Sequence, residues 1–253
     1  IKSNLDNIEK IVGFTFKNAT VVNNQNNYNC INVSGFKNLA GSQITKDDIS
    51  FILNDLRKII SDSQPNNSLI HLFNSNFILD KNIVKSLPIG LHGEFYNQHL
   101  TFFLLPTNDL KNLKLIFHNC HISIERIIFK YFADGINFIS NNKVSDFFIK
   151  INIDKKRSNI SIFKNLSFIF SEDFLFGSDI IMKDVKKACS LDEDTVQNIF
   201  DRLSFSKLEN NNSFLEKDYF TKDNYKKISL KFLDQIVSAT IEEILNIILK
   251  KNI

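Results

Sequence analysis

The chain has 253 residues, 43% of them hydrophobic, and its 31 basic and 28 acidic side chains leave a formal net charge of only +3. This balance excludes the broad basic surface of a nucleic-acid-binding protein, and no segment approaches the ~18 consecutive apolar residues of a membrane span. Three widely spaced cysteines show neither disulfide nor metal-site spacing, which fits a reducing cytoplasm. Because the first residue is isoleucine rather than methionine, we expect a fragment of a longer protein.

The first half of the chain predicts a compact sheet covered by helices. Residues 1–20 carry apolar side chains at helical spacing and predict a helix, and residues 30–33 predict a short strand. Thr45 and Asp48 have the spacing of a capping box, which opens a second helix. β-Branched and aromatic runs then predict strands at 69–79, 98–105 and 122–130, with a helix at 110–120.

The second half predicts two strands joined by a charged turn, followed by helices. The strand FFIKINI (147–153) leads into the turn DKKRSN, and the strands ISIF and LSFIF follow it. A helix is expected at 180–188, and the polar residues 205–224 are expected to form a loop or small hairpins. A long amphipathic helix is expected at 230–250.

Three sequence stretches in the first half resemble the inserted subdomain of the bacterial cell-division protein FtsA. They are IHLFNSNFILD, PIGLHGEFYNQHLTFFLLPT and NDLKNLKLIFHNCHISIERIIF, which follow one another without a long gap. The resemblance implies an α/β, actin-like (ribonuclease H-like) fold with a small inserted α+β subdomain. It also implies three segments: residues 1–40 end the first actin-like subdomain, 41–130 form the insert, and 131–253 form an incomplete second lobe.

The same resemblance locates a nucleotide site whose phosphate-binding glycines are gone. The family motif DIGGGTTDI aligns with residues 152–160, where amides replace both acidic side chains and no glycine is left. The motif's other positions hold Asp154, Lys155, Lys156, Arg157 and Ser158. Glycine allows the backbone to approach a phosphate closely, so we expect no catalysis here. Two interpretations stay open: a solvated hairpin turn, or phosphate binding by the basic side chains.

Two further family motifs are also altered. A turn-helix motif aligns with residues 174–185, where Gly177 and Asp184 match and Ser178 replaces a second glycine. The family's nucleoside-contacting Glu and Lys are both replaced within residues 196–200. Along the last helix, the resemblance implies a face for the C-terminal tail of FtsZ that includes Glu243 and Asn246, although Thr240 stands where the family has arginine.

The resemblance implies a cell-division adaptor that links FtsZ filaments to the membrane. The altered motifs give it a degenerate nucleotide site, for which we expect no metal and no cofactor, although binding of ATP with Mg²⁺ stays open. Its expected partners are FtsZ, further copies of itself, and later division proteins that dock on residues 41–130. It would act in the bacterial cytoplasm at the inner face of the membrane at the division site, through a membrane-binding helix beyond this chain, without nucleic acid. The alternatives are an active actin-like ATPase and a pilus-assembly adaptor of the PilM type.

Overall fold

The computed structural model describes all residues except 1, 26, 142–145, 204–212, 221–224 and 251–253. Its elements are α1 (Lys2–Val12), β1 (Asn18–Asn23), β2 (Asn29–Asn38), α2 (Lys46–Ser63), β3 (Asn67–Leu79), β4 (Asn82–Val84), β5 (Phe95–Pro106), α3 (Thr107–His118), β6 (Ser123–Phe129), α4 (Lys130–Asn141), β7 (Phe147–Ile153), β8 (Ser158–Lys164), β9 (Ser167–Phe174), α5 (Asp179–Cys189), α6 (Glu193–Arg202), the 3-10 turn η2 (Lys217–Tyr219) and α7 (Leu230–Lys250).

The chain divides into two compact units. Unit 1 comprises residues 1–150 and 161–172, and unit 2 comprises residues 151–160 and 173–253. Each of the three strands in the sheet β7-β8-β9 has some residues in unit 1 and the rest in unit 2. This division differs from the three segments expected from the sequence, which stay a prediction.

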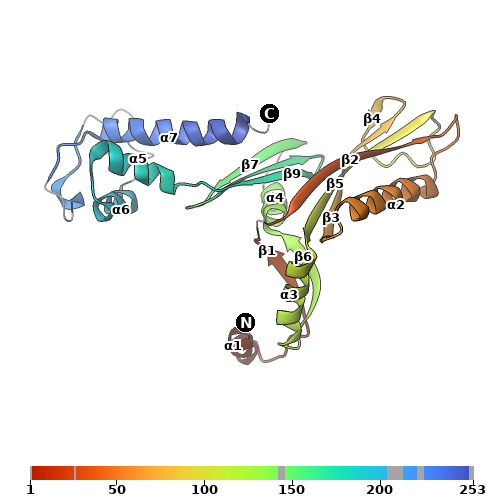
Figure 1. Cartoon of the computed structure of the whole chain (residues 1–253), viewed down its shortest axis with the longest axis horizontal. Coiled ribbons are helices and arrows are strands. Elements are labelled where there is room, and N and C mark those ends of the chain that lie inside the picture. The colour runs from red at the N-terminus through yellow and green to blue at the C-terminus, as the bar shows by residue number, and fades with distance from the viewer. Residues whose placement is uncertain (1, 26, 142–145, 204–212, 221–224, 251–253) are drawn as a thin grey trace. The chain divides into compact units, whose positions relative to one another are not determined.

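Unit 1 contains an antiparallel sheet of order β2-β5-β3-β4, with α2 lying along one of its faces (Figure 1). Alternate side chains of a strand point to opposite faces, and β5 is buried on both. Phe102 packs in the core beneath α2, whereas Phe103 belongs to a second core that includes Phe129, Phe163 and Phe168. The rings of Phe103 and Phe168 stack with their centroids 4.4 Å apart.

The predicted capping box begins α2. The Thr45 backbone N–H donates to the Asp48 carboxylate at 2.7 Å, and the Asp48 N–H donates to the Thr45 hydroxyl at 3.2 Å. The ammonium group of Lys37 on β2 lies 2.5 Å from the same carboxylate. Local capping and a strand-to-helix ion pair therefore hold α2 against the sheet.

The helix expected over residues 1–20 is shorter than predicted. Gly13 ends α1 with a positive φ of 77°, and its N–H donates to the carbonyl of Glu9 at 2.8 Å. Glycine suits this left-handed position because it has no Cβ. Residues 18–23 instead form β1, which pairs in parallel with β6 more than 100 positions away.

Unit 2 is built from the ends of β7, β8 and β9 together with α5, α6 and α7. Helix α7 runs beside α5 (Figure 1). Leu233, Val237 and Ile244 supply the buried stripe of α7, as the helical spacing predicts. The loop expected at 205–224 falls largely outside the described residues. No helix in the described part of the chain has the length and apolarity needed to cross a bilayer.

Candidate functional site

The turn between β7 and β8 is the segment that the sequence comparison aligned with the family's phosphate-binding hairpin. The Asp154 N–H donates to the carbonyl of Arg157 at 2.8 Å, which closes the turn. The side chains of residues 154–157 are exposed, whereas Ser158 is buried. The Ser158 hydroxyl donates to the carbonyl of Phe176 at 2.8 Å. That hydroxyl therefore serves the internal packing of unit 2.

The first N–H groups of α5 are occupied by this turn. The Ser178 N–H donates to the Asp154 carbonyl, and the Asp179 N–H donates to the Lys155 carbonyl, both at 2.9 Å. Unpaired N–H groups at a helix N-terminus form a ready anion site. Here two of those donors already bind carbonyl oxygens.

Gly177 is required by the close approach of the same two segments. A Cβ at this position would lie 2.0 Å from the Asp154 carbonyl oxygen and 2.7 Å from the Arg157 nitrogen. Both atoms belong to backbone, so neither can move aside as a flexible side chain would. Gly177, which matches a glycine of the family's turn-helix motif, thus lies directly against the turn. Because glycine has no side chain, the turn can pack against the start of α5.

An amide stands where the family motif has its second carboxylate. Asn159 is buried, and its Nδ2 donates to Oδ1 of Asp173 at 2.9 Å. A carboxylate only accepts hydrogen bonds, so the amide nitrogen is the atom that faces Asp173. Mg²⁺ binds oxygen ligands and favours carboxylates. A nitrogen donor at this position does not fit that requirement.

The turn, α5 and α6 together form a pocket of about 460 Å³. Its lining residues are Lys155, Lys156, Asp179, Met182, Lys183, Lys186, Glu193, Val196 and Gln197. Four lysines against two carboxylates leave a formal surplus of two positive charges. The ammonium group of Lys186 lies 3.6 Å from the Glu193 carboxylate across the pocket.

Two of these lysines were missed by the motif comparison. Asp179, Met182, Lys183 and Lys186 have the spacing i, i+3, i+4, i+7 and therefore share one face of α5. That spacing is visible in the sequence. It places Lys183 and Lys186 on the same helix face as Asp179, the first residue of α5. The sequence thus shows a basic face on α5, and the packing of α6 beside that face forms the pocket.

Asp184, in contrast, lies away from the pocket lining. The hydroxyl of Thr240 on α7 donates to Oδ2 of Asp184 at 2.9 Å, and Thr240 is buried. Asp184 and Thr240, which the sequence comparison placed in two different family motifs, therefore contact each other. Their hydrogen bond joins α5 to α7.

Glu243 and Asn246 do come together, in a shallow groove along α7. The groove has a volume of about 700 Å³. It is lined by Ala239, Glu242, Glu243, Asn246, Ile247 and Lys250. Ile247 is 45% exposed and gives the groove an apolar centre flanked by charges of both signs.

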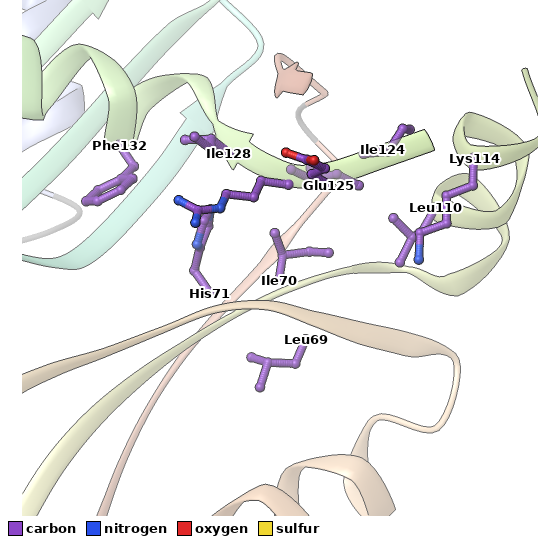
Figure 2. Close-up of a pocket in the computed structure, with 11 residues that line it drawn as sticks. Leu69, Ile70, His71, Leu110, Lys114, Ile124, Glu125, Ile128 and Phe132 are labelled. Carbon is purple, nitrogen blue, oxygen red and sulfur yellow. The ribbon is translucent and has the colours of Figure 1, made fainter. Parts of the chain in front are cut away.

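Unit 1 has a separate pocket of about 550 Å³ (Figure 2). Figure 2 shows Glu125 and Ile128 of β6 across from Ile70 and His71 of β3, with Leu110 and Lys114 of α3 at one end. Leu69 and Ile124 also belong to the lining. Among the described residues β6 pairs only with β1, and β3 before Phe77 pairs only with β5. Each strand therefore has an edge that no other described strand pairs with.

His71 is the ionisable group most affected by burial in this pocket. Its Nε2 accepts a hydrogen bond from the Phe129 N–H at 3.3 Å, so the ring proton lies on Nδ1. Burial lowers the pKa of His71 below its usual value of 6.5. The rings of Phe73 and Phe132 each lie 5.6 Å from the imidazole. His71 is therefore a neutral, packed side chain near pH 7.

The comparisons with known proteins agree with this architecture. The family model of the SHS2 domain inserted in FtsA matches residues 26–97, which contain β2, α2, β3 and β4. The cell division protein FtsA of Buchnera aphidicola subsp. Acyrthosiphon pisum is 20% identical over 171 residues, covering 68% of this chain and 40% of the relative. The chain thus spans less than half the length of that relative.

Among solved structures, the PilM-PilN type IV pilus biogenesis complex matches with a TM-score of 0.53 at 7% identity, covering 98% of this chain and 63% of the other. MreB 5 of Spiroplasma citri bound to AMPPNP has a TM-score of 0.41 at 11% identity, with 59% and 48% covered. The chain therefore has an actin-like α/β fold with an inserted SHS2 domain, as the sequence predicted. Within that class the protein it resembles is FtsA, and the resemblance inferred from the sequence is confirmed.

Proposed function

We propose that the chain is part of an FtsA-like cell-division adaptor that acts as a protein–protein scaffold, not as an ATPase. It would act in the bacterial cytoplasm at the inner face of the membrane. The observation that carries the proposal is the pairing of the Ser178 and Asp179 N–H groups with carbonyls of the turn at residues 154–157. These donors are the backbone groups that would otherwise face a phosphate.

Metal chemistry is also poorly supported at this site. Hydrolysis of a phosphoanhydride needs a positioned metal ion as well as a cradle for the phosphates. Asn159 donates to Asp173 through its amide nitrogen, and the exposed turn has lysines where the family has glycine. Side-chain cations can attract a phosphate, but they do not organise Mg²⁺ and an attacking water.

Titration of the full-length protein with Mg-ATP, followed by a phosphate-release assay, tests the proposal. We expect no phosphate release above that of a heat-denatured sample. An established actin-like ATPase assayed in parallel controls for the sensitivity of the assay. Micromolar Mg-ATP binding accompanied by turnover would overturn the proposal in favour of an active ATPase.

We assign the groove along α7 as the contact for FtsZ. Its support is the exposed Ile247 beside Glu243 and Asn246, which gives a binding segment an apolar anchor and polar flanks. Ile247→Asp should abolish co-sedimentation with FtsZ filaments from the same cell, whereas Gln235→Ala, exposed and outside the groove, should not. Binding to a pilus inner-membrane protein in place of FtsZ would favour a PilM-type adaptor.

We assign the pocket between β3 and β6 as the site where residues 41–130 recruit later division proteins. An extended apolar segment could pair with an open strand edge there and place side chains against Ile70 and Leu110. Leu110→Asp should weaken binding of the cytoplasmic segment of such a protein, and Lys114→Ala should alter its salt dependence. Lys111→Ala, exposed on the same helix but outside the pocket, serves as the control. Unchanged binding in both pocket variants would refute the assignment.

A further inference from the structure

Unit 1 has a further pocket between the C-terminal end of α2 and the strands β3 and β5. Its volume is about 410 Å³, which lies within the range of roughly 300–1,000 Å³ that is typical of small-molecule sites. Among their described lining residues, this pocket and the one between β3 and β6 share only Leu69. The pocket at the end of α2 is therefore a separate candidate for ligand binding.

The floor of this pocket is the open end of the core beneath α2. Ile60, Phe102 and Leu104 line it and are buried members of that core. Leu69 pairs with Leu104 in the sheet but is 38% exposed, so the floor stays accessible to solvent beside it. The register of β3 shifts between Leu69 and His71, and Figure 2 shows these two side chains on opposite sides of the strand. This bulge directs Leu69 toward α2 and completes an apolar floor.

The rim of the pocket offers hydrogen-bond donors and one positive charge. Arg57 supplies a guanidinium group, and no carboxylate is among the described residues that line the pocket. The side-chain oxygen of Gln64 accepts from Nδ2 of Asn67 at 2.9 Å and from Nδ2 of Asn29 at 3.3 Å. Within the described residues, the amide nitrogen of Gln64 therefore remains to donate, and the Ser61 hydroxyl adds another donor. These groups favour an anionic ligand over a cationic one.

The charge of Arg57 is not neutralised along its own helix. Side chains three and four positions away are neighbours on a helix surface. For Arg57 these neighbours are Leu53, Asn54, Ile60 and Ser61, and none of them carries a charge. In the part of the chain that the structure describes, Arg57 also forms no ion pair. Its guanidinium group is therefore available to a carboxylate of a bound ligand.

We propose that this pocket binds a small amphipathic carboxylate, whose apolar chain lies on the floor while its carboxylate group pairs with Arg57. The planar guanidinium fork matches the geometry of a carboxylate and binds it through two parallel hydrogen bonds. A single rim cation also matches a monoanion, whereas a phosphate monoester carries about two negative charges near neutral pH. This inference goes beyond the proposed scaffold function and does not depend on it.

Ligand-observed NMR titration of the full-length protein tests the inference with hexanoate, hexanol and hexylamine, which share one chain length and differ in charge. We expect hexanoate to bind with a Kd on the order of 1 mM and hexanol to bind roughly fivefold more weakly. The apolar floor contributes to both, whereas the guanidinium group contributes mainly to the carboxylate. Hexylamine should bind most weakly, because its ammonium group would lie beside Arg57. Absence of hexanoate binding, or an equal or higher affinity for hexanol or hexylamine, would overturn the inference.

Variants of α2 locate the site and provide a matched control. Arg57→Gln should lower the affinity for hexanoate roughly fivefold and leave that for hexanol unchanged. Lys58→Gln removes the same charge from the next position, outside the pocket lining, and should leave both affinities unchanged. Ser61→Phe should fill the pocket and abolish binding of both ligands. All three positions are exposed, so the fold should stay intact. An equal loss in Arg57→Gln and Lys58→Gln, or full hexanoate binding in Ser61→Phe, would refute a defined site.

Discussion

The carbonyl oxygen of Asp154 accepts a hydrogen bond from the backbone N–H of Ser178 at 2.9 Å. This contact joins a hairpin turn to the first turn of a helix 24 positions later in the chain. Each segment satisfies backbone groups that the other leaves unpaired. The turn and the start of α5 therefore form one structural unit, whose integrity depends on how closely the two backbones approach.

Gly177→Ala should disrupt this unit. The added Cβ would meet the Asp154 carbonyl oxygen at 2.0 Å and the Arg157 nitrogen at 2.7 Å, so the backbone must shift and weaken both hydrogen bonds to the turn. We expect a loss of about 2 kcal/mol in the free energy of unfolding, which is the usual cost of adding a methyl group to a position that is already fully packed. Urea denaturation followed by circular dichroism measures it.

Ser178→Ala is the matched control for Gly177→Ala. The Ser178 side chain makes no capping hydrogen bond, and its backbone N–H is unaffected by the substitution. The change should therefore stay within about 0.5 kcal/mol of the wild type. A Gly177→Ala protein as stable as Ser178→Ala would contradict the close approach of the turn to α5.

Thr45→Ala should destabilise α2. The variant loses the hydroxyl that accepts from the Asp48 N–H at 3.2 Å and donates to the Asp48 carboxylate at 2.6 Å. Removal of such an N-cap costs about 1 kcal/mol of folding free energy, and thermal or urea denaturation would detect it. Thr45→Ser keeps the hydroxyl and should retain most of that stability. Equal losses in the two variants would argue against capping as the cause.

The stability of unit 1 should depend on pH through Asp48. The hydrogen bond from Lys37, followed by those from Thr45, lowers the pKa of Asp48 from 3.8 to about 2. A carboxylate with a lowered folded-state pKa stabilises the fold above its unfolded pKa, and this contribution is lost as pH falls from 3.8 toward 2. Asp48→Asn should therefore flatten the stability profile in that window. Asp47→Asn, exposed on the same turn, should keep the wild-type profile; matching profiles for the two variants would refute the assignment.

Local signals in the sequence were sufficient for some elements and insufficient for others. The capping box at Thr45 and the apolar stripe of α7 depend on neighbours within a few residues, and both were predicted. Strand β1 was missed because its partner β6 lies more than 100 positions away. Isolated strand propensity is weak, and distant pairing decides whether such a segment becomes a strand.

The candidate site shows the same limit. The missing glycines in residues 154–156 could be found by comparing positions with a motif. The partner of Asp184 could not, because Thr240 reaches it only when α7 packs on α5. Lys183 and Lys186 lay between these cases: their helical spacing was visible, but only the packing of α6 turned that face into a pocket.

Thr240→Val should weaken the packing of α7 on α5. Valine keeps the shape of threonine but removes the hydroxyl that donates to Asp184 at 2.9 Å, and the position is only 5% exposed. A hydrogen bond to a charged acceptor contributes about 1.5 kcal/mol, so we expect a loss of that size in the free energy of unfolding. A double-mutant cycle with Asp184→Ala checks the cause, because Thr240→Val should then cost much less. An undiminished cost in the Asp184→Ala background would mean that the lost stability comes from repacking around valine and not from the hydrogen bond.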